Sequence, residues 1–441
     1  MTAVASSLAL VVIGPRHSPL SVVLVAVSTG ACGFVAVFER RSPCLGIRPI
    51  AAAITLVFTV AVVVPPRSSN DLWSYTMYGR AVSVHSESPY ERVPADFPSD
   101  PFLSRVSPVW RHRASLFGPA FVGFASVGTS LAGDSALANR LFFQLAAAAA
   151  AAVVLVILWR RTRSPAALTW LGLHPAFGAL AINGGHIDVL IGLGILSAAL
   201  LAARHRGALA GLVIGVVALM KLTALLALVG VVLWGWRRRD SRLVTRAVVA
   251  TAACVALGYA AVLNSAVHAL HGADRTVTSA SVWNPIAEAL VGHDAGRGLA
   301  HPLAPNPTLT VLFYASFALV GAVAVLVGWR AAQSHRPEPV VGGTTASYTM
   351  AANYTYPWYS SWALPVFTNA RPSKLGWIVW LQAALMAAAQ MWPLHPTGAV
   401  PDTIVRAALD YLAPMLLLIA FVVIGLQGKG DADDVPAVDL A

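Results

Sequence analysis

The run "AAAITLVFTVAVVVPP" (residues 51–66) has no charged side chain, and three residues later the chain continues as "NDLWSYTMYGR" (residues 70–80). A helix crosses the hydrocarbon core of a bilayer with about 20 apolar residues. Similar apolar runs recur along the 441 residues, and only 11% of the chain is charged, against roughly 25% in soluble domains. The sequence therefore predicts an all-α fold, a polytopic transmembrane helical bundle.

The apolar runs predict about thirteen crossings, because each crossing takes roughly 17 to 25 residues. The run 207–236 is too long for one helix and contains Lys221, so a hairpin of two short helices is expected there. A short crossing is expected at 358–370. The remaining helices are expected at 19–38, 49–66, 137–159, 165–182, 187–203, 243–263, 308–329, 339–356, 374–393 and 403–427.

The net charge of +11 is carried largely by short basic clusters between the apolar runs. Such clusters favour the cytoplasmic side of a membrane protein. A contiguous basic patch interleaved with aromatics would be expected of a nucleic-acid-binding protein, so no nucleic-acid partner is predicted. The clusters are 39–48, 160–163, 204–206, 237–242, 330–336 and 370–374.

These clusters share one side only if the glycine-containing segment 117–131 does not cross, which fits a re-entrant or interfacial helix on the outer face. The prediction is thus one integral-membrane domain over 1–427, multi-pass in the plasma membrane. A long external loop, 67–136, carries juxtamembrane helices, and 264–307 forms a second external loop. The polar residues 428–441 are expected to be a disordered cytoplasmic tail.

The stretch 70–80 places a carboxylate on an aromatic face. If it is helical, Asp71, Tyr75 and Tyr78 lie on the same side, at positions i, i+4 and i+7. One interpretation is an active-site carboxylate beside an amphipathic surface formed by the two tyrosines. The other is a helix N-cap formed by Asp71 or Asn70.

Two further polar features interrupt apolar runs. His186 and Asp188 follow the turn "NGG" (183–185), which predicts either a cavity-facing pair or a capped turn. Lys221 has no charged neighbour for more than ten residues on either side. Its ammonium either snorkels to the interface or meets an anion such as a lipid phosphate.

Arginines and aromatics complete the set of candidate residues. A phosphate requires cations, and the candidates are Lys221, His186, Arg80, Arg111 and Arg113. Trp358 and Tyr359, in "YTYPWYSSW" (354–362), predict either an aromatic belt or a sugar-stacking surface. The chain has no Gly-rich phosphate loop after a strand, so an activated substrate is expected to arrive on a lipid.

The order of these features resembles the GT-C superfamily of integral-membrane glycosyltransferases, in particular the actinobacterial polyprenol-phosphate-mannose-dependent α-mannosyltransferases. The pattern runs from Asp71 through "SPY", "FGP", "NGGHID" and "AGLVIGVVALMKLTALL" to "YPWY". The resemblance implies a catalytic carboxylate at Asp71 and donor-phosphate binding by Lys221 and His186. Position 70 is Asn where many relatives carry a second acid, so neither a metal nor another cofactor is predicted.

The implied function is transfer of mannose from a polyprenyl-phosphate-linked donor to a glycolipid or lipoglycan acceptor on the external face, with inversion. Asp71 would be the general base, and Asp188 would orient His186 or bind sugar hydroxyls. Besides these two substrates, membrane lipids are the expected partners. The alternative is a polytopic transporter or flippase of lipid-linked or small polar substrates. The expected substrate-binding residues are Tyr75, Tyr78, Arg80, His186, Asp188, Lys221, Trp358 and Tyr359.

Overall fold

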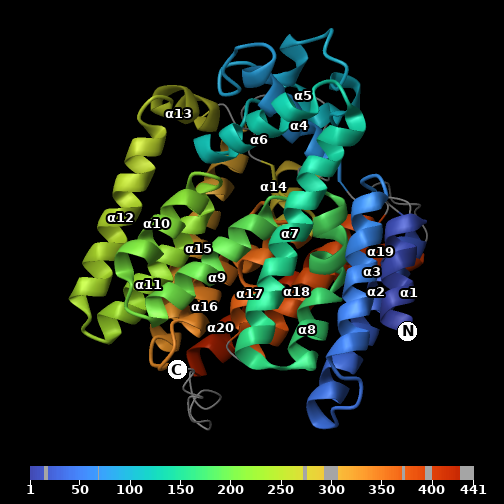
Figure 1. The fold of residues 1–441 in the computed structure, drawn as a ribbon, viewed down its shortest axis with the longest axis vertical. Helices are drawn as coiled ribbons and strands as arrows, with labels where there is room; N and C mark the ends of the chain where they lie inside the picture. The colour runs from blue at the N-terminus through green and yellow to red at the C-terminus, as the bar shows by residue number, and fades with distance from the viewer. Residues whose placement is uncertain are drawn as a thin grey trace.

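The computed structural model describes residues 1–13, 18–67, 69–271, 276–292, 306–369, 373–392 and 400–427. All regular elements within these ranges are helical (Figure 1). The first ten α-helices are α1 (Thr2–Val12), α2 (Pro19–Arg41), α3 (Ile47–Val63), α4 (Asp71–Ser83), α5 (Pro108–Arg111), α6 (Pro119–Ala132), α7 (Ala136–Thr162), α8 (Pro165–Gly172), α9 (Asp188–Ala203) and α10 (Gly207–Ala218). The others are α11 (Leu226–Arg237), α12 (Ser241–Tyr259), α13 (Leu263–His271), α14 (Asn284–Val291), α15 (Pro307–Ala331), α16 (Glu338–Ala351), α17 (Leu364–Asn369), α18 (Lys374–Met391), α19 (Val400–Arg406) and α20 (Ala413–Gln427).

Short 3₁₀ and π turns join several of these helices. They are η1 (Pro94–Asp96), η2 (Leu103–Arg105), η3 (Pro175–Ala181), η4 (Leu222–Leu225), η5 (Pro357–Trp362) and η6 (Ala407–Leu412).

The all-α prediction is confirmed, and the chain has the helices of a multi-pass membrane protein. Within the described ranges, five helices are long and apolar enough to cross a bilayer: α2, α7, α12, α15 and the continuous stretch Thr403–Gln427. Six shorter apolar helices accompany them. The number of crossings, about thirteen, stays a prediction. The expected tail 428–441 and part of the loop 264–307 lie outside the described residues.

Three expected helices differ from the structure, and one of them, at 358–370, consists of the 3₁₀ turn η5 followed by the short helix α17. The run 165–182 is divided, because α8 ends at Gly172 and the π turn η3 begins at Pro175, which cannot donate an amide hydrogen bond. His174 caps this turn, with Nδ1 accepting from the Ala176 amide (3.2 Å). The helix expected at 339–356 ends at Ala351, and the chain then runs as a loop to η5.

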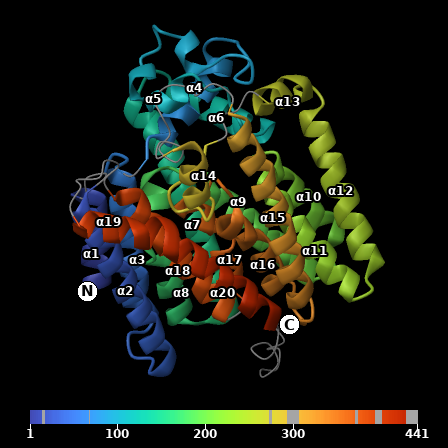
Figure 2. The same ribbon diagram turned by 180° about the vertical axis from the view of Figure 1, so that it is seen from behind.

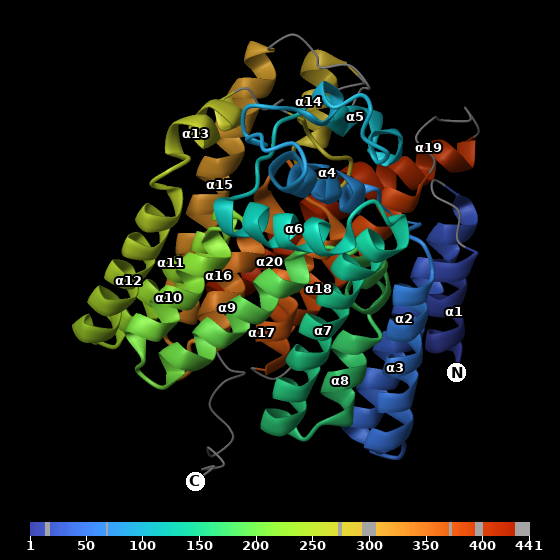
Figure 3. The same cartoon turned by 45° about the horizontal axis from the view of Figure 1, so that its top comes forward.

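The segments expected to be external gather at one end of the bundle. Helices α4, α5 and α6 cover this end, and α13 and α14 reach it from the second segment (Figures 1 and 2). Helix α6 lies across the ends of the bundle helices (Figure 3). It is fixed to the α10–α11 hairpin by amides of Gly118 and Ala120, which donate to the carbonyls of Met220 and Leu219 (both 3.1 Å).

A glycine allows α4 to lie against α6. A Cβ on Gly79 would lie 2.5 Å from the Ala125 carbonyl oxygen, so only glycine fits this contact. Gly123, on α6 itself, has nothing within 4 Å of the equivalent position.

Gly79→Ala is therefore expected to lower the stability of the folded protein by about 1–3 kcal/mol, because the backbones of α4 and α6 must separate. Gly123→Ala is the matched control and should leave the melting temperature in detergent unchanged. Equal melting temperatures for the two variants would contradict the close contact between these helices.

Candidate functional site

Asp71 begins helix α4 with its carboxylate partly open to solvent. Its amide donates to the Ser69 hydroxyl (3.0 Å), so Ser69 supplies an oxygen to the start of the helix, where one interpretation of the sequence had offered Asp71 or Asn70 as the cap. The Asp71 side chain is 29% exposed, and its Oδ2 lies 3.8 Å from His186 Nδ1. At the first helical position the carboxylate also experiences the positive end of the helix dipole.

The two tyrosines follow Asp71 at the fourth and seventh positions of a continuous helix, so the predicted helical spacing is confirmed, and both are buried. The Tyr75 ring meets Phe117 and Phe121 edge-on, at centroid distances of 5.3 and 5.1 Å. Burial, and then the charge of Asp71, raise the pKa of Tyr75 well above its usual range, so the hydroxyl remains a donor at neutral pH. Tyr78 donates its hydroxyl to the Arg113 carbonyl (3.2 Å), which holds the external loop over α4.

The "NGGHID" turn brings His186 to Asp71. The Asn183 amide group donates to the carbonyls of Ala61, Val64 and Pro65 (3.0–3.2 Å), so the turn is fixed to the end of α3, just before α4 begins. Gly185 has φ +63°, the left-handed region that favours glycine. A Cβ on Gly184 would lie 2.2 Å from His186 Nε2, so glycine leaves room for the imidazole.

An aromatic stack extends from His186. The imidazole lies on the Trp358 ring at 3.6 Å between centroids and 12° between planes. Tyr356 lies on Trp358 at 4.8 Å and 3°. Trp358 is only 2% exposed, whereas Tyr356 is partly exposed. The stack thus connects Tyr356 to the site, and burial, and then the charge of Asp71, raise the pKa of its hydroxyl to about 12.

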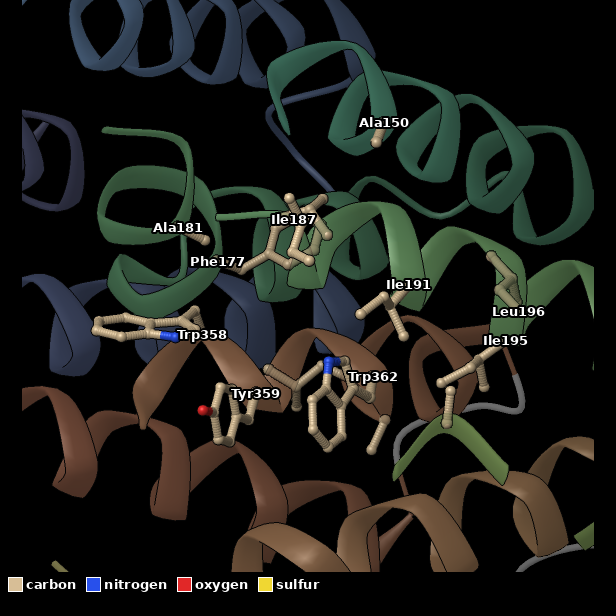
Figure 4. Packing of buried hydrophobic residues seen from close by; sticks show 14 of the residues in the cluster. Ala150, Phe177, Ala181, Ile187, Ile191, Ile195, Leu196, Trp358, Tyr359 and Trp362 are labelled. Atoms are coloured by element: carbon tan, nitrogen blue, oxygen red, sulfur yellow. The ribbon is translucent and has the colours of Figure 1, made fainter. Parts of the chain in front are cut away.

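Asp188 and Lys221 form an ion pair in the interior. Asp188 is 1% exposed, and its Oδ1 accepts from Lys221 Nζ (3.3 Å) and from Trp362 Nε1 (3.0 Å). The contact partner of Asp188 is therefore Lys221, whereas the sequence had offered His186. Figure 4 shows Tyr359 and Trp362 of η5 packed in the cluster that contains Ile187 and Ile191.

Aromatic rings surround the Lys221 ammonium. It lies 3.5 Å from the Tyr359 ring centroid, 4.9 Å from that of Trp362 and 5.9 Å from that of Phe117. Cation–π attraction of this kind is stronger when the cation is desolvated. The Lys221 side chain retains 16% exposure, and its charge lies within electrostatic reach of Asp71.

Of the three predicted arginines, only Arg113 acts on residues of the site. Arg80 lies nine residues along α4 from Asp71, about 13 Å at 1.5 Å per residue, so the structure does not bring it to the site. It is buried and pairs with Asp100 (2.8 Å) and Asp134 (2.9 Å). Arg111 donates to carbonyls of its own loop. Arg113 is the loop arginine whose charge acts on Tyr78 and Tyr356.

Two members of the site were missed in the sequence. Tyr356 and Trp362 flank the predicted Trp358 and Tyr359 in "YTYPWYSSW", and the aromatic density of that segment was the available signal. Among the described residues, no group of three or more His, Cys, Asp or Glu side chains is arranged to hold a metal ion. The site thus combines an accessible carboxylate, a histidine, a caged ammonium and a partly exposed tyrosine.

Comparison with known proteins shows the family to which the chain belongs. Residues 4–238 match the sequence model described as "Alpha-(1->6)-mannopyranosyltransferase, N-terminal domain". The chain is 26% identical to alpha-(1->6)-mannopyranosyltransferase A of Corynebacterium glutamicum, over 82% of this chain and 79% of the relative. It is 28% identical to alpha-(1->6)-mannopyranosyltransferase A of Mycobacterium tuberculosis, over 68% of this chain and 61% of that relative.

Arg80→Met is expected to lower the stability of the fold by about 3 kcal/mol, because the buried Asp100 carboxylate loses the guanidinium and keeps only His85 as a side-chain partner among the described residues. Asp134→Asn is the matched control: the Asp134 side chain is 79% exposed, and an exposed pair contributes at most about 1 kcal/mol. Thermal unfolding in detergent measures both. A melting temperature for Arg80→Met equal to that of Asp134→Asn would argue against a structural role for Arg80.

Proposed function

The chain is a mannosyltransferase that belongs to the alpha-(1->6)-mannopyranosyltransferase family, and from this premise we propose that it transfers mannose from a polyprenyl-phosphate-linked donor. The acceptor is a hydroxyl of a glycolipid or lipoglycan, and the 6-hydroxyl of a mannose is the position that the family description favours. The reaction takes place at the end of the bundle covered by α4–α6, on the external face of the plasma membrane. The observation that carries this proposal is the accessible Asp71 carboxylate beside His186.

Asp71 acts as general base in this proposal. Its carboxylate accepts the proton of the acceptor hydroxyl across a hydrogen bond of about 2.6–3.2 Å. The hydroxyl oxygen forms a bond to the anomeric carbon from the face opposite the phosphate. The bond between that carbon and the phosphate oxygen breaks, and its electron pair leaves with polyprenyl phosphate. A β-linked donor therefore gives an α-linked product.

His186 holds the Asp71 carboxylate in place. Its ring is fixed by stacking on Trp358, and its Nδ1 lies on the Asp71 side at 3.8 Å. The sugar contact is assigned to the partly exposed Tyr356, which Trp358 supports from below, together with the tyrosines of α4. Tyr359 acts through Lys221, since its ring lies against the ammonium.

Lys221 stabilises the leaving phosphate. Preorganised cations in a water-poor site stabilise developing negative charge strongly, because they need no reorganisation during the reaction. Asp188 keeps the ammonium charged and fixed within the aromatic cage. The Asp188 Oδ2 atom is buried and has no hydrogen-bond partner among the described residues, which suits a contact with a substrate hydroxyl. Arg113 supplies a second positive charge from the external loop.

Asp71→Asn is expected to lower kcat by about 10²–10⁴-fold, the usual contribution of a general base, while lowering stability by no more than about 1 kcal/mol, the usual contribution of a carboxylate at a helix start. The measurement is transfer of mannose from synthetic polyprenyl phosphate mannose in purified detergent preparations. Asp134→Asn, which removes an exposed carboxylate from the same end of the bundle, is the matched control. Turnover at the wild-type rate in Asp71→Asn would refute the assignment.

Lys221→Met is expected to lower both stability and transfer, because it leaves Asp188 buried without its cation. The double variant Lys221→Met with Asp188→Asn removes both charges and is expected to recover the melting temperature. Its kcat should remain about 10²–10³-fold below wild type, the loss typical when a stabilising group for developing negative charge is removed. Recovery of transfer together with stability would show that Lys221 has only a structural role.

A further inference from the structure

Helices α10 and α12 border an open apolar groove of about 670 Å³ on the outside of the bundle. Ala208 and Leu212 of α10 line it together with Leu219, the residue that follows α10, and Ala253, Cys254 and Gly258 line it from α12. The groove runs beside the line along which the two helices touch. A Cβ on Gly211 would lie 2.2 Å from the Ala247 carbonyl oxygen, so the helix axes are close there.

The groove lies where lipid chains would be. Helix α12 is one of the candidate membrane spans, and only 17% of its apolar window is buried inside the protein. Figure 1 shows α12 at the edge of the bundle with α10 beside it. The lining from Ala208 to Leu219 extends about 16 Å, at 1.5 Å per residue of helix.

One end of the groove adjoins the site. The Leu219 carbonyl accepts from the Ala120 amide, so the beginning of α6 lies over this end. Lys221 follows two residues after Leu219, and its Nζ lies 5.9 Å from the centroid of the Phe117 ring, just before α6. In space, the apolar groove is therefore followed by the Lys221 ammonium and then by the Asp71 carboxylate.

We propose that this groove holds the first isoprene units of the donor's polyprenyl chain, with the donor phosphate at Lys221. The inference rests on the proposed function and adds a binding site for the lipid part of its substrate. In the donor the chain is bonded to the phosphate, and the phosphate to the reacting sugar. That order matches the order of groove, Lys221 and Asp71. In a lipoglycan acceptor, other sugars lie between the lipid and the reacting hydroxyl, so its chain does not fit this arrangement.

Filling the groove tests the proposal. Ala253→Trp places a large side chain in the groove, and Val249→Trp places the same side chain on an exposed part of α12 that does not line it. Two synthetic donors are compared, one with a chain of about ten isoprene units and one with about two. We expect Ala253→Trp to raise KM for the long-chain donor about tenfold, since several methylene groups lose their burial. The kinetics of the short-chain donor and of Val249→Trp should follow wild type.

An unchanged KM for the long-chain donor in Ala253→Trp would overturn the proposal. So would an equal rise for both donors, since that reports a distorted active site. A second measurement uses photoreactive polyprenyl phosphate and photoreactive phosphatidylglycerol in matched vesicles. The polyprenyl probe should label residues 208–219 and 250–258, with competition by unlabelled polyprenyl phosphate. Equal labelling by the phospholipid without such competition would identify a site for ordinary membrane lipid and also overturn the proposal.

The experiments distinguish a failure of the groove proposal from a failure of the proposed reaction. If Asp71→Asn retains wild-type turnover, the assignment of the base fails, whatever the dependence on chain length. If Asp71→Asn is inactive and Ala253→Trp behaves as Val249→Trp does, only the groove proposal fails.

Discussion

The buried ion pair between Asp188 and Lys221 is the interaction on which the arrangement of the site depends. A lone ammonium in an apolar interior is costly, and a paired one is tolerated only with good geometry and further contacts. Here the contacts come from three separate segments: α9 provides Asp188, the hairpin tip provides Lys221, and η5 provides Trp362 and Tyr359. The requirement to satisfy one charge thus holds these segments in fixed relation.

A second constraint fixes the other half of the site. Asn183 and Gln144 both donate to the carbonyl oxygens of Ala61 and Val64 near the end of α3. These side chains satisfy carbonyls that a helix end leaves without intrahelical partners. The same bonds place the turn before His186 beside the segment that leads into Asp71. One set of hydrogen bonds therefore has two effects. It satisfies the carbonyl oxygens at the end of α3, and it brings His186 close to Asp71.

The helices were largely predictable from the sequence, whereas several partners in the site were not. Apolar runs long enough to cross a bilayer dictate helices, and the break at Lys221 correctly indicated a hairpin. The placement of Tyr75 and Tyr78 with Asp71 followed from helical periodicity. The partner of Asp188 did not, because Trp362 is 174 residues away and Lys221 is 33 away. The partners of Arg80 were not predictable either. Its guanidinium pairs with Asp100 and Asp134, which lie in loops, and helical periodicity does not predict contacts between a helix and a loop.

The pairing of Lys221 with Asp188 also bears on the basicity of Asp71. A nearby cation lowers the basicity of a carboxylate, and an opposing negative charge beside that cation reduces its effect. Asp188 lies in direct contact with the ammonium, whereas Asp71 interacts with it only at longer range. In the proposed reaction, the ammonium would therefore act on the donor phosphate while Asp188 offsets part of its influence on the Asp71 carboxylate. The rings of Tyr359 and Trp362 cover part of the ammonium, and the 16% of the Lys221 side chain that stays exposed is where the proposed phosphate would make contact.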